Sequence, residues 1–223
     1  MHAIATALQS LQPGPAVDST GSGDYEPLTE DVIRRLIAGY FYVDQLLQDD
    51  VDLFSFGASH HWLELNHIVL CGTSPETRLQ AADHICLTER HFYNDAVGGI
   101  GERMEWAGLH RWRGTDSFAA TLFLHTISTP QLFIEGNSRT ATLIASYILA
   151  RSGYPPLVVT DATYSDYKAL VHDCRRLVRT RWWDMLVFPM RCYRVENFIR
   201  GAANKEFLCG NSLSDADEYL ERH

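Results

Sequence analysis

The sequence has no apolar run long enough to span a bilayer, and its first residues lack the charged and then apolar pattern of a secretory signal. It has no Cys-x-x-Cys pair: its five cysteines are scattered and odd in number, which is typical of reduced thiols rather than of disulfides or structural zinc. Positive charge is scarce, because 19 Lys and Arg stand against 28 Asp and Glu and leave a net charge of −9. This balance argues against general binding to nucleic acid or to an anionic membrane. We therefore expect a cytoplasmic protein that binds a small molecule or another protein, and a homo-oligomer stays open.

Hairpin signals and internal repeats are absent as well, whereas apolar residues recur at helical spacing through most of the chain. The fold class predicted is all-α. With 223 residues, of which 46% are apolar, the chain can bury one sizeable core. We expect an extended N-terminal arm over residues 1–27, where Pro and Gly gather after Gln12, and a single helical domain over residues 28–223.

Helix starts and stops divide this domain. Helices are expected over about residues 29–48, 54–70, 74–93, 100–109, 116–128, 164–179 and 182–200, with a further one that starts near Ser138 and stops at Gly153. Pro189 is expected to kink the helix over 182–200, a short extended piece is expected over 155–160, and a last acidic helix from about Ser214.

The segment from Gln131 to Thr142 reads Q-L-F-I-E-G-N-S-R-T-A-T and places an acid, a Gly-Asn turn and an arginine directly before an apolar helix. A helix start presents unpaired backbone N–H groups and a partial positive charge, so it can bind an anion that Arg139 neutralises. Glu135 can hold a divalent cation against the same anion. The residues expected to wrap the anion are Gly136, Asn137 and Ser138.

This segment resembles the loop motif of the Fic family, His-x-Phe-x-Asp/Glu-Gly-Asn-x-Arg-x-x-Arg, which lies between two helices of a small helical domain. The matching residues are Phe133, Glu135, Gly136, Asn137 and Arg139. The family's histidine falls on Gln131 and its second arginine on Thr142. Trp106-Ala107-Gly108 is similar to a Trp-Ala-Gly signature that often precedes the motif. The resemblance implies a Fic-like helical bundle with the motif loop between two central helices and a core over about residues 100–200.

The resemblance also implies a site. Glu135 would bind Mg²⁺, and Gly136, Asn137, Ser138 and Arg139 would hold the phosphates of a nucleotide, ATP above all, during transfer of a nucleotidyl or related group to a small-molecule or protein acceptor. In the family the histidine is the base that deprotonates the acceptor hydroxyl. The amide of Gln131 has no titratable proton near neutral pH, and loss of a positioned base typically costs about 10²–10⁴ in rate.

Two hypotheses follow from the missing base. In the first, the chain is a divergent nucleotidyl- or phosphate-group transferase with Gln131, Glu135 and Arg139 at the reaction centre, where Gln131 orients the acceptor or the nucleotide by hydrogen bonding. Either the acceptor is then already nucleophilic, or another residue supplies the base, or the reaction differs. In the second, the chain is a non-catalytic binding or regulatory module on the same scaffold.

His60, Glu64 and His67 offer a separate candidate, because they stand at i, i+4 and i+7 on one face of an expected helix. Imidazole and carboxylate can hold zinc, iron or manganese, which makes a metal-dependent enzyme the third hypothesis. If the same helix lines the pocket of Glu135, the side chains of His60, Asn66 and His67 become contacts for the acceptor instead.

The case for a role in the site is weaker for the other charged residues. His125 and His110 are candidates for the missing base. The arginines of a basic run near a helix end are expected to form a solvated face, with phosphate binding as the less favoured alternative: Arg175, Arg176, Arg179 and Arg181. The family's β-hairpin flap, which docks the target segment, has little room between Gly108 and Asp116, so the resemblance implies a small acceptor or another covering element.

Overall fold

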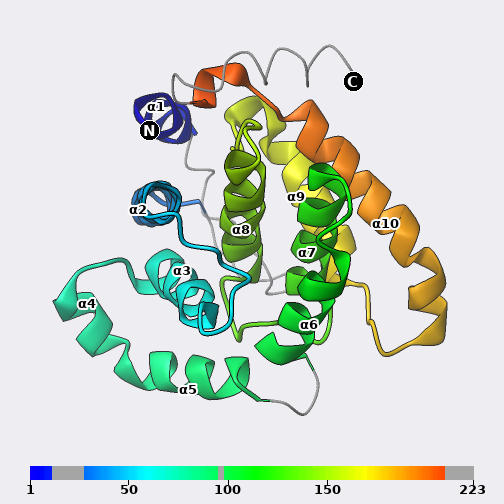
Figure 1. Cartoon of the computed structure of the whole chain (residues 1–223). Helices are drawn as coiled ribbons and strands as arrows, with labels where there is room; N and C mark the ends of the chain where they lie inside the picture. The colour runs from blue at the N-terminus through cyan, green and yellow to red at the C-terminus, as the bar shows by residue number, and fades with distance from the viewer. Residues whose placement is uncertain (12–27, 95–97, 209–223) are drawn as a thin grey trace, which may run out of the picture.

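A computed structural model describes residues 1–11, 28–94 and 98–208 of the chain. The described residues form helices and no strand, so the all-α prediction is confirmed (Figure 1). The α-helices are α1 (His2–Gln9), α2 (Glu30–Gln48), α3 (Ser59–Cys71), α4 (Pro75–Gln80), α5 (Ala82–Phe92), α6 (Ile100–His110), α7 (Thr115–Ile127), α8 (Asn137–Arg151), α9 (Asp161–Arg175) and α10 (Trp182–Gly201), followed by a 3-10 turn, η1 (Lys205–Phe207). The helix expected from Ser214 lies outside the described residues. Within the described part of the chain no helix is both long and apolar enough to cross a membrane.

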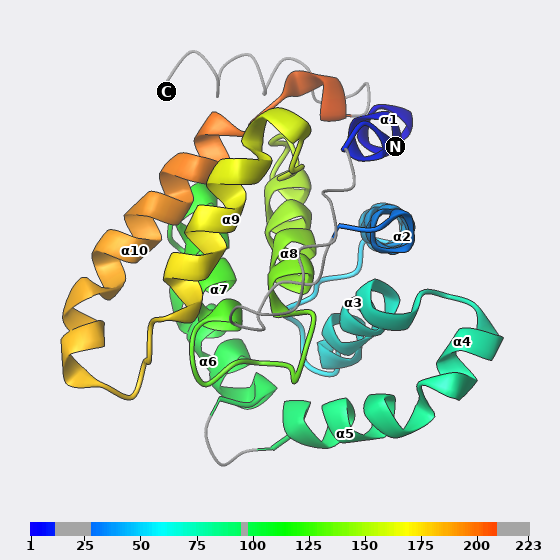
Figure 2. The same ribbon diagram turned by 180° about the vertical axis from the view of Figure 1, so that it is seen from behind.

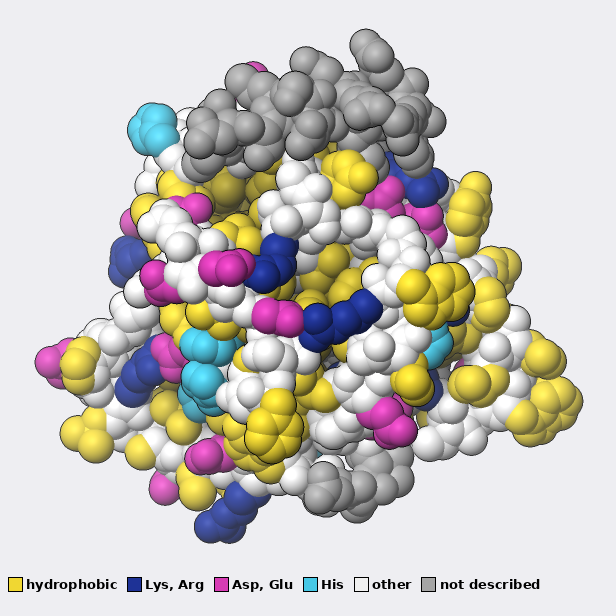
Figure 3. Space-filling view, viewed as in Figure 1, with side chains coloured by type: hydrophobic (Ala, Val, Ile, Leu, Met, Phe, Trp, Pro, Cys, Tyr) yellow, Lys and Arg dark blue, Asp and Glu magenta, His cyan; other side chains and the backbone are white. Residues whose placement is uncertain are grey.

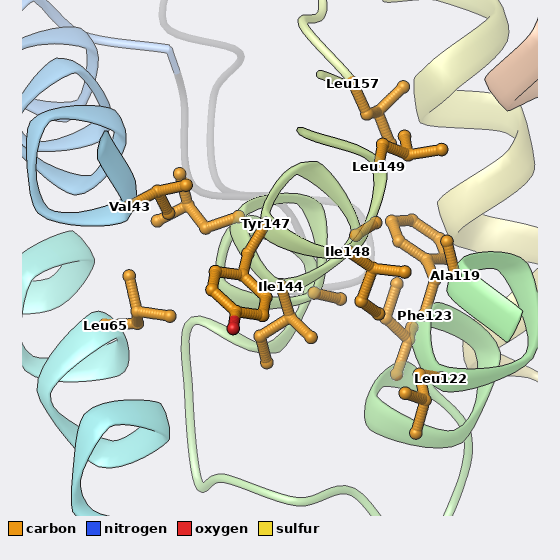
Figure 4. Close-up of a cluster of buried hydrophobic side chains, with 14 of the residues drawn as sticks. Val43, Leu65, Ala119, Leu122, Phe123, Ile144, Tyr147, Ile148, Leu149 and Leu157 are labelled. Atoms are coloured by element: carbon orange, nitrogen blue, oxygen red, sulfur yellow. The ribbon is translucent and has the colours of Figure 1, made fainter. Parts of the chain in front are cut away.

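Helix α8 lies at the centre of the molecule. In Figures 1 and 2 it stands between α2 and α3 on one side and α7, α9 and α10 on the other, while α4 and α5 run below α3. Every residue from Asn137 to Leu149 except Arg139 is buried, so α8 has no solvent-facing side over most of its length. Figure 4 shows why: Ile144, Tyr147 and Ile148 of α8 meet apolar side chains that approach from several neighbouring elements. A helix packed on all sides is held in a fixed position, and the loop that leads into its N-terminus is held with it.

The extended piece expected over 155–160 is present but pairs with no strand. Leu157, Val158 and Val159 are buried, and the Leu157 carbonyl accepts hydrogen bonds from the hydroxyls of Tyr40 and Ser146. Side chains thus satisfy a buried backbone group that a sheet partner would otherwise satisfy. This segment carries the chain back along α8 toward α9.

Several predicted boundaries need correction. Residues 2–9, expected to belong to an extended arm, form α1, which packs Ile4 and Leu8 into the core beside α2; residues 12–27 lie outside the described residues. Helix α3 starts at Ser59 rather than near residue 54, because Gly57 has φ of 87° and the Asp52 carboxylate accepts the Phe54 N–H, so turns occupy this stretch. The helix expected over 74–93 is divided at Ala81 into α4 and α5, and no local sequence feature explains the division.

Candidate functional site

The segment between α7 and α8 starts from a rigid anchor. The Pro130 carbonyl accepts hydrogen bonds from Arg103 and Arg179, each at 2.9 Å. The backbone of Thr129 pairs with Leu177 and Arg179, which ties the loop to the connection between α9 and α10. The side chain of Arg179 is only 7% exposed, so the expectation of a solvated arginine face is wrong at this residue. Its guanidinium is used inside the molecule to hold the loop.

Asn137, the first residue of α8, closes the loop on itself. Its Oδ1 accepts the Phe133 N–H at 2.9 Å, and its Nδ2 donates to the Phe133 carbonyl at 2.7 Å and to Gln131 Oε1 at 3.4 Å. Gln131 in turn donates from Nε2 to the Ile127 carbonyl at the end of α7, at 3.1 Å. The side-chain amide of Asn137 therefore spans the loop, and that of Gln131 joins the loop to α7. Gln131 fixes the loop through both ends of its side chain and has no group that can accept a proton near neutral pH.

Gly136 stands at the tightest point of the loop, directly before α8. Its φ of 73° lies in the left-handed region, and a Cβ placed on it would stand 2.9 Å from Asn66 Nδ2 and 3.2 Å from Leu70 Cδ2. Asn66 is fully buried on α3 and donates to the Glu135 carbonyl at 2.9 Å and to Thr140 Oγ1 at 3.1 Å. The predicted contact of Asn66 with an acceptor is therefore replaced by a different role: Asn66 supports the loop from behind.

We expect Gly136→Ala to lower the free energy of unfolding by about 1–2 kcal/mol, because alanine is strained in the left-handed region and its Cβ meets the Asn66 amide. Urea denaturation would measure the loss. Gly201→Ala is the control, since nothing lies within 4 Å of a Cβ at that position. An unchanged stability of Gly136→Ala would contradict the strained turn.

The loop and the first turn of α8 form one wall of a cavity of about 580 Å³. In the rear view of Figure 2 this loop lies at the lower end of α8. The cavity brings together every residue of the predicted cradle: Gln131, Glu135, Gly136, Asn137, Ser138 and Arg139. The lining also includes apolar side chains, among them Leu28, Val32 and Leu36 of the segment that starts α2. The cavity therefore combines a polar helix start with an apolar wall, within the size range of small-molecule sites.

The family's second arginine has no counterpart at Thr142, which faces the interior. The Thr142 hydroxyl donates to the Ser138 carbonyl and meets the Tyr167 hydroxyl, each at 2.9 Å. Arg175 of α9 lines the same cavity, a position that the expectation of a solvated arginine face missed. Burial raises the pKa of Tyr167, whereas the hydrogen bonds to Thr142 and Ser138, and then the charges of Arg139 and Arg175, oppose that rise. Both guanidinium groups therefore act on one hydroxyl of the cavity wall, and Arg139 also donates to the Val69 carbonyl at 2.9 Å.

The metal site proposed for His60, Glu64 and His67 is wrong. Among the described residues, no group of three or more His, Cys, Asp or Glu side chains is arranged to hold a metal ion. Glu64 instead accepts two hydrogen bonds from Arg78, at 2.7 and 3.0 Å, and His60 Nδ1 is 2.8 Å from the Gly57 carbonyl oxygen. Neither His60 nor His67 lines the large cavity. His67 lines a small one of about 120 Å³ with His84 and Glu135, where burial is the main cause that lowers its pKa.

The two histidines considered as replacement bases lie elsewhere. His110 stacks on Trp106 and its Nδ1 is 2.8 Å from the Trp106 carbonyl oxygen. His125 is enclosed between Trp106 and Phe188, and its Nδ1 is 3.3 Å from Arg179. Burial, followed by the charge of Arg179, lowers the pKa of His125 to about 3, so it stays neutral in the folded protein over most of the acid range.

Because the pKa of His125 falls from 6.5 to about 3, the unfolded chain binds a proton between those values and the folded chain does not. The free energy of unfolding should then fall as pH drops, with this residue contributing up to about 1.4 kcal/mol per pH unit between about pH 6 and pH 3. Denaturation of the wild type and of His125→Gln across this range measures the contribution. Parallel curves for the two proteins would contradict it.

The segment between Gly108 and Asp116 does not adjoin the loop at all. Arg111 pairs with Asp52 at 2.8 Å, and both line a different cavity of about 280 Å³ with Arg151, the last residue of α8. That cavity is at the opposite end of α8 from the motif loop. Helix α5 adjoins the loop instead: His91 Nε2 is 3.1 Å from the Gln131 carbonyl oxygen, and Phe92 stacks on Phe133 with ring centroids 5.3 Å apart. No sequence pattern connects these positions, which are 40 residues apart.

The site is thus a cavity of small-molecule size at the start of a buried helix, with two arginines in its lining, in an all-helical protein. No protein-family model matches the chain, and no curated protein matches it. The solved structures similar to it include a Fic domain containing signaling protein from Bacteroides thetaiotaomicron VPI-5482, with 16% identity, a TM-score of 0.48 and coverage of 100% of this chain and 97% of that chain. They also include Fic-1 from C. elegans, with 15% identity, a TM-score of 0.44 and coverage of 98% of this chain and 61% of that chain.

Proposed function

We propose that the chain is a divergent Fic-type protein that binds a nucleoside triphosphate with Mg²⁺ and transfers a nucleotidyl or related phosphate-containing group to a hydroxyl acceptor. The observation that carries this proposal is the cavity of about 580 Å³ into which the start of α8, Glu135, Arg139 and Arg175 converge. An enclosed helix start has backbone N–H groups without intrahelical partners, and nearby guanidinium groups add positive charge. This arrangement favours a ligand with several negative oxygens.

The polar and apolar parts of the cavity lining suggest how such a ligand would lie. The phosphates would occupy the polar end, against the N–H groups of Gly136, Asn137 and Ser138, between Arg139 and Arg175. The base and sugar would lie toward the apolar side formed by Leu28, Val32 and Leu36. The loop needs no rearrangement to accept the phosphates, because Asn137 and Asn66 already fix its backbone.

Glu135 fits a magnesium site that the nucleotide completes. Its side chain is exposed and it lines the cavity beside the helix start. Mg²⁺ is commonly held by one or two carboxylates together with phosphate oxygens and water, so one protein ligand is sufficient. When bound, the ion would neutralise charge on the phosphates. Glu135 would place it on the side of the loop that faces the cavity.

Calorimetry with ATP and Mg²⁺ tests the proposal. We expect Arg175→Ala to weaken binding about 10- to 100-fold, because a hydrogen bond to a charged group contributes about 1.5–3 kcal/mol. Arg176→Ala is the matched control, since Arg176 is the exposed neighbour of Arg175 and does not line the cavity. Equal affinities of the two variants, or no heat with any nucleotide, would contradict the anion site.

A non-catalytic binding module is the second candidate, and the fixed amide of Gln131 is the observation that favours it. In that case nucleotide binds but no group is transferred. Intact-mass analysis of protein partners incubated with the chain, ATP and Mg²⁺ separates the two candidates. A mass gain on any partner excludes the non-catalytic module.

A further inference from the structure

A histidine of α5 lies beside Gln131, the residue at the position of the motif's base. His91, near the end of α5, has an exposed side chain, and its Nε2 is 3.1 Å from the carbonyl oxygen of Gln131. The adjoining Phe92 is fully buried and stacks on Phe133 of the motif loop, with the ring planes 10° apart. The end of α5 is therefore packed against the loop, and His91 is held beside residue 131.

The hydrogen bond determines which nitrogen of His91 carries the proton. A carbonyl oxygen only accepts, so Nε2 must donate an N–H. In the neutral imidazole the other nitrogen, Nδ1, then has a free lone pair. A histidine with one nitrogen fixed by a hydrogen bond and the other available is the arrangement in which imidazole acts as a base.

We propose that His91 is the general base of the transfer reaction, in place of the histidine that the motif lacks at Gln131. This inference rests on the proposed function. The acceptor hydroxyl would enter between the cavity and the exposed edge of α5. His91 does not itself line the cavity; it adjoins the cavity through Gln131, which does.

The step balances with the groups named. The acceptor oxygen forms a bond to the α-phosphorus, and its proton passes to His91 Nδ1. The bond from the α-phosphorus to the bridging oxygen breaks, and that oxygen leaves with its electron pair as part of diphosphate. The imidazolium later returns its proton to solvent. Gln131 contributes through its backbone, because its carbonyl fixes the tautomer of the base.

His91→Gln is the informative variant, because glutamine keeps an N–H donor for the Gln131 carbonyl but cannot take up a proton near neutral pH. The probe is ATP labelled at the α-phosphate, with Mg²⁺, and the label is followed into nucleoside monophosphate and onto the protein and added serine- and tyrosine-containing peptides. We expect His91→Gln to bind ATP as the wild type does in calorimetry and to transfer the label about 10²–10⁴ times more slowly. The control is His172→Gln, since His172 is an exposed histidine on a different helix, α9.

The outcomes separate the two proposals. A rate for His91→Gln equal to that of the wild type overturns His91 as the base, and so does a wild-type protein that binds ATP without turnover. Absence of ATP binding by the wild type overturns the proposed function itself. Wild-type affinity of His91→Gln for ATP in calorimetry, together with the slower transfer, excludes a merely structural role.

A second inference concerns α10, where apolar side chains face outward. Figure 3 shows hydrophobic side chains gathered at the lower right, over the first turns of this helix. The side chains between 55% and 71% exposed are Trp182, Trp183, Met185, Leu186, Met190 and Tyr193. Positions 182, 186, 190 and 193 recur at helical spacing and so form one face.

This face matches half of a protein interface in size. Six large side chains that are more than half exposed present on the order of 600 Å² of apolar surface, which is large for a monomer. A standard interface buries about 800 Å² per partner. The net charge of −9 disfavours an anionic membrane as the occupant. We infer that this face pairs with the same face of a second copy about a two-fold axis.

Sedimentation velocity at about 100 µM protein tests this dimer, since typical protein interfaces have dissociation constants below that concentration. We expect the wild type to be a dimer and Leu186→Glu to be a monomer, because a charge at the centre of an apolar interface stays unpaired on both copies. Leu109→Glu, at a similarly exposed position but on α6, should remain a dimer. A monomeric wild type, or a dimer that persists in Leu186→Glu, overturns the inference.

Discussion

Asn137→Ala should lower the free energy of unfolding by about 2–5 kcal/mol and abolish binding of ATP with Mg²⁺. Asn137 is 2% exposed and satisfies both backbone groups of Phe133, so alanine leaves a buried donor and a buried acceptor without partners. Each unsatisfied group costs about 1–3 kcal/mol. The loop would also lose the hydrogen bonds that hold it over the helix start. Urea denaturation measures the first effect and calorimetry the second.

A second substitution separates stability from binding. Asn137→Asp can still accept the Phe133 N–H, and its charge is favoured at the start of α8, so we expect a smaller loss of stability than for alanine. The same negative charge should repel phosphates, and ATP binding should still be lost. Asn197→Ala, at an exposed position of α10, is the control. Retained ATP binding by Asn137→Asp would contradict an anion site at this helix start.

Arg103→Met should be comparably damaging, with an expected loss of about 3–5 kcal/mol. The Arg103 side chain is 0% exposed and donates to three backbone carbonyls, those of Gly99, His125 and Pro130. Methionine fills a similar volume but removes the hydrogen bonds from Arg103 to these three buried carbonyls. Because Arg179 still holds the Pro130 carbonyl, the loop should keep part of its anchorage and ATP binding should weaken without disappearing.

Arg103→Lys distinguishes charge from hydrogen-bond geometry, since lysine keeps the charge but lacks the planar fork that reaches several carbonyls at once. Its stability should lie between those of the wild type and of Arg103→Met. Unfolding curves in urea would show the order. A methionine variant as stable as the wild type would contradict the view that Arg103 holds the start of the loop.

The helices could be predicted because apolar periodicity and capping residues are local properties. Thr29 caps α2 as expected, with its hydroxyl accepting the Val32 N–H, and the start of α8 falls at the predicted Gly-Asn turn. The composition of the loop likewise predicted the residues that now share one cavity. The break of the helix over 74–93 at Ala81 could not be predicted, because no local residue marks it.

Sequence reasoning misses His91 and ranks phosphate binding by Arg175 below a solvated face, because both residues reach the site through the fold. Arg175 arrives from α9 and His91 from α5, and neither stands at a spacing from the motif that suggests a contact. The wrong prediction of a metal site has the same cause. His60, Glu64 and His67 share a helix face, but Arg78 approaches from the next helix and takes the carboxylate. Periodicity shows which residues share a face but not what packs against it.

The most direct test of the account is a crystal structure of the chain with Mg²⁺ and a non-hydrolysable ATP analogue. The account predicts phosphate density against the backbone N–H groups of residues 136–138, between Arg139 and Arg175, with the metal ion on Glu135. Density instead in the cavity at the opposite end of α8, among Arg111 and Arg151, would contradict it, as would a cavity without nucleotide at saturating analogue.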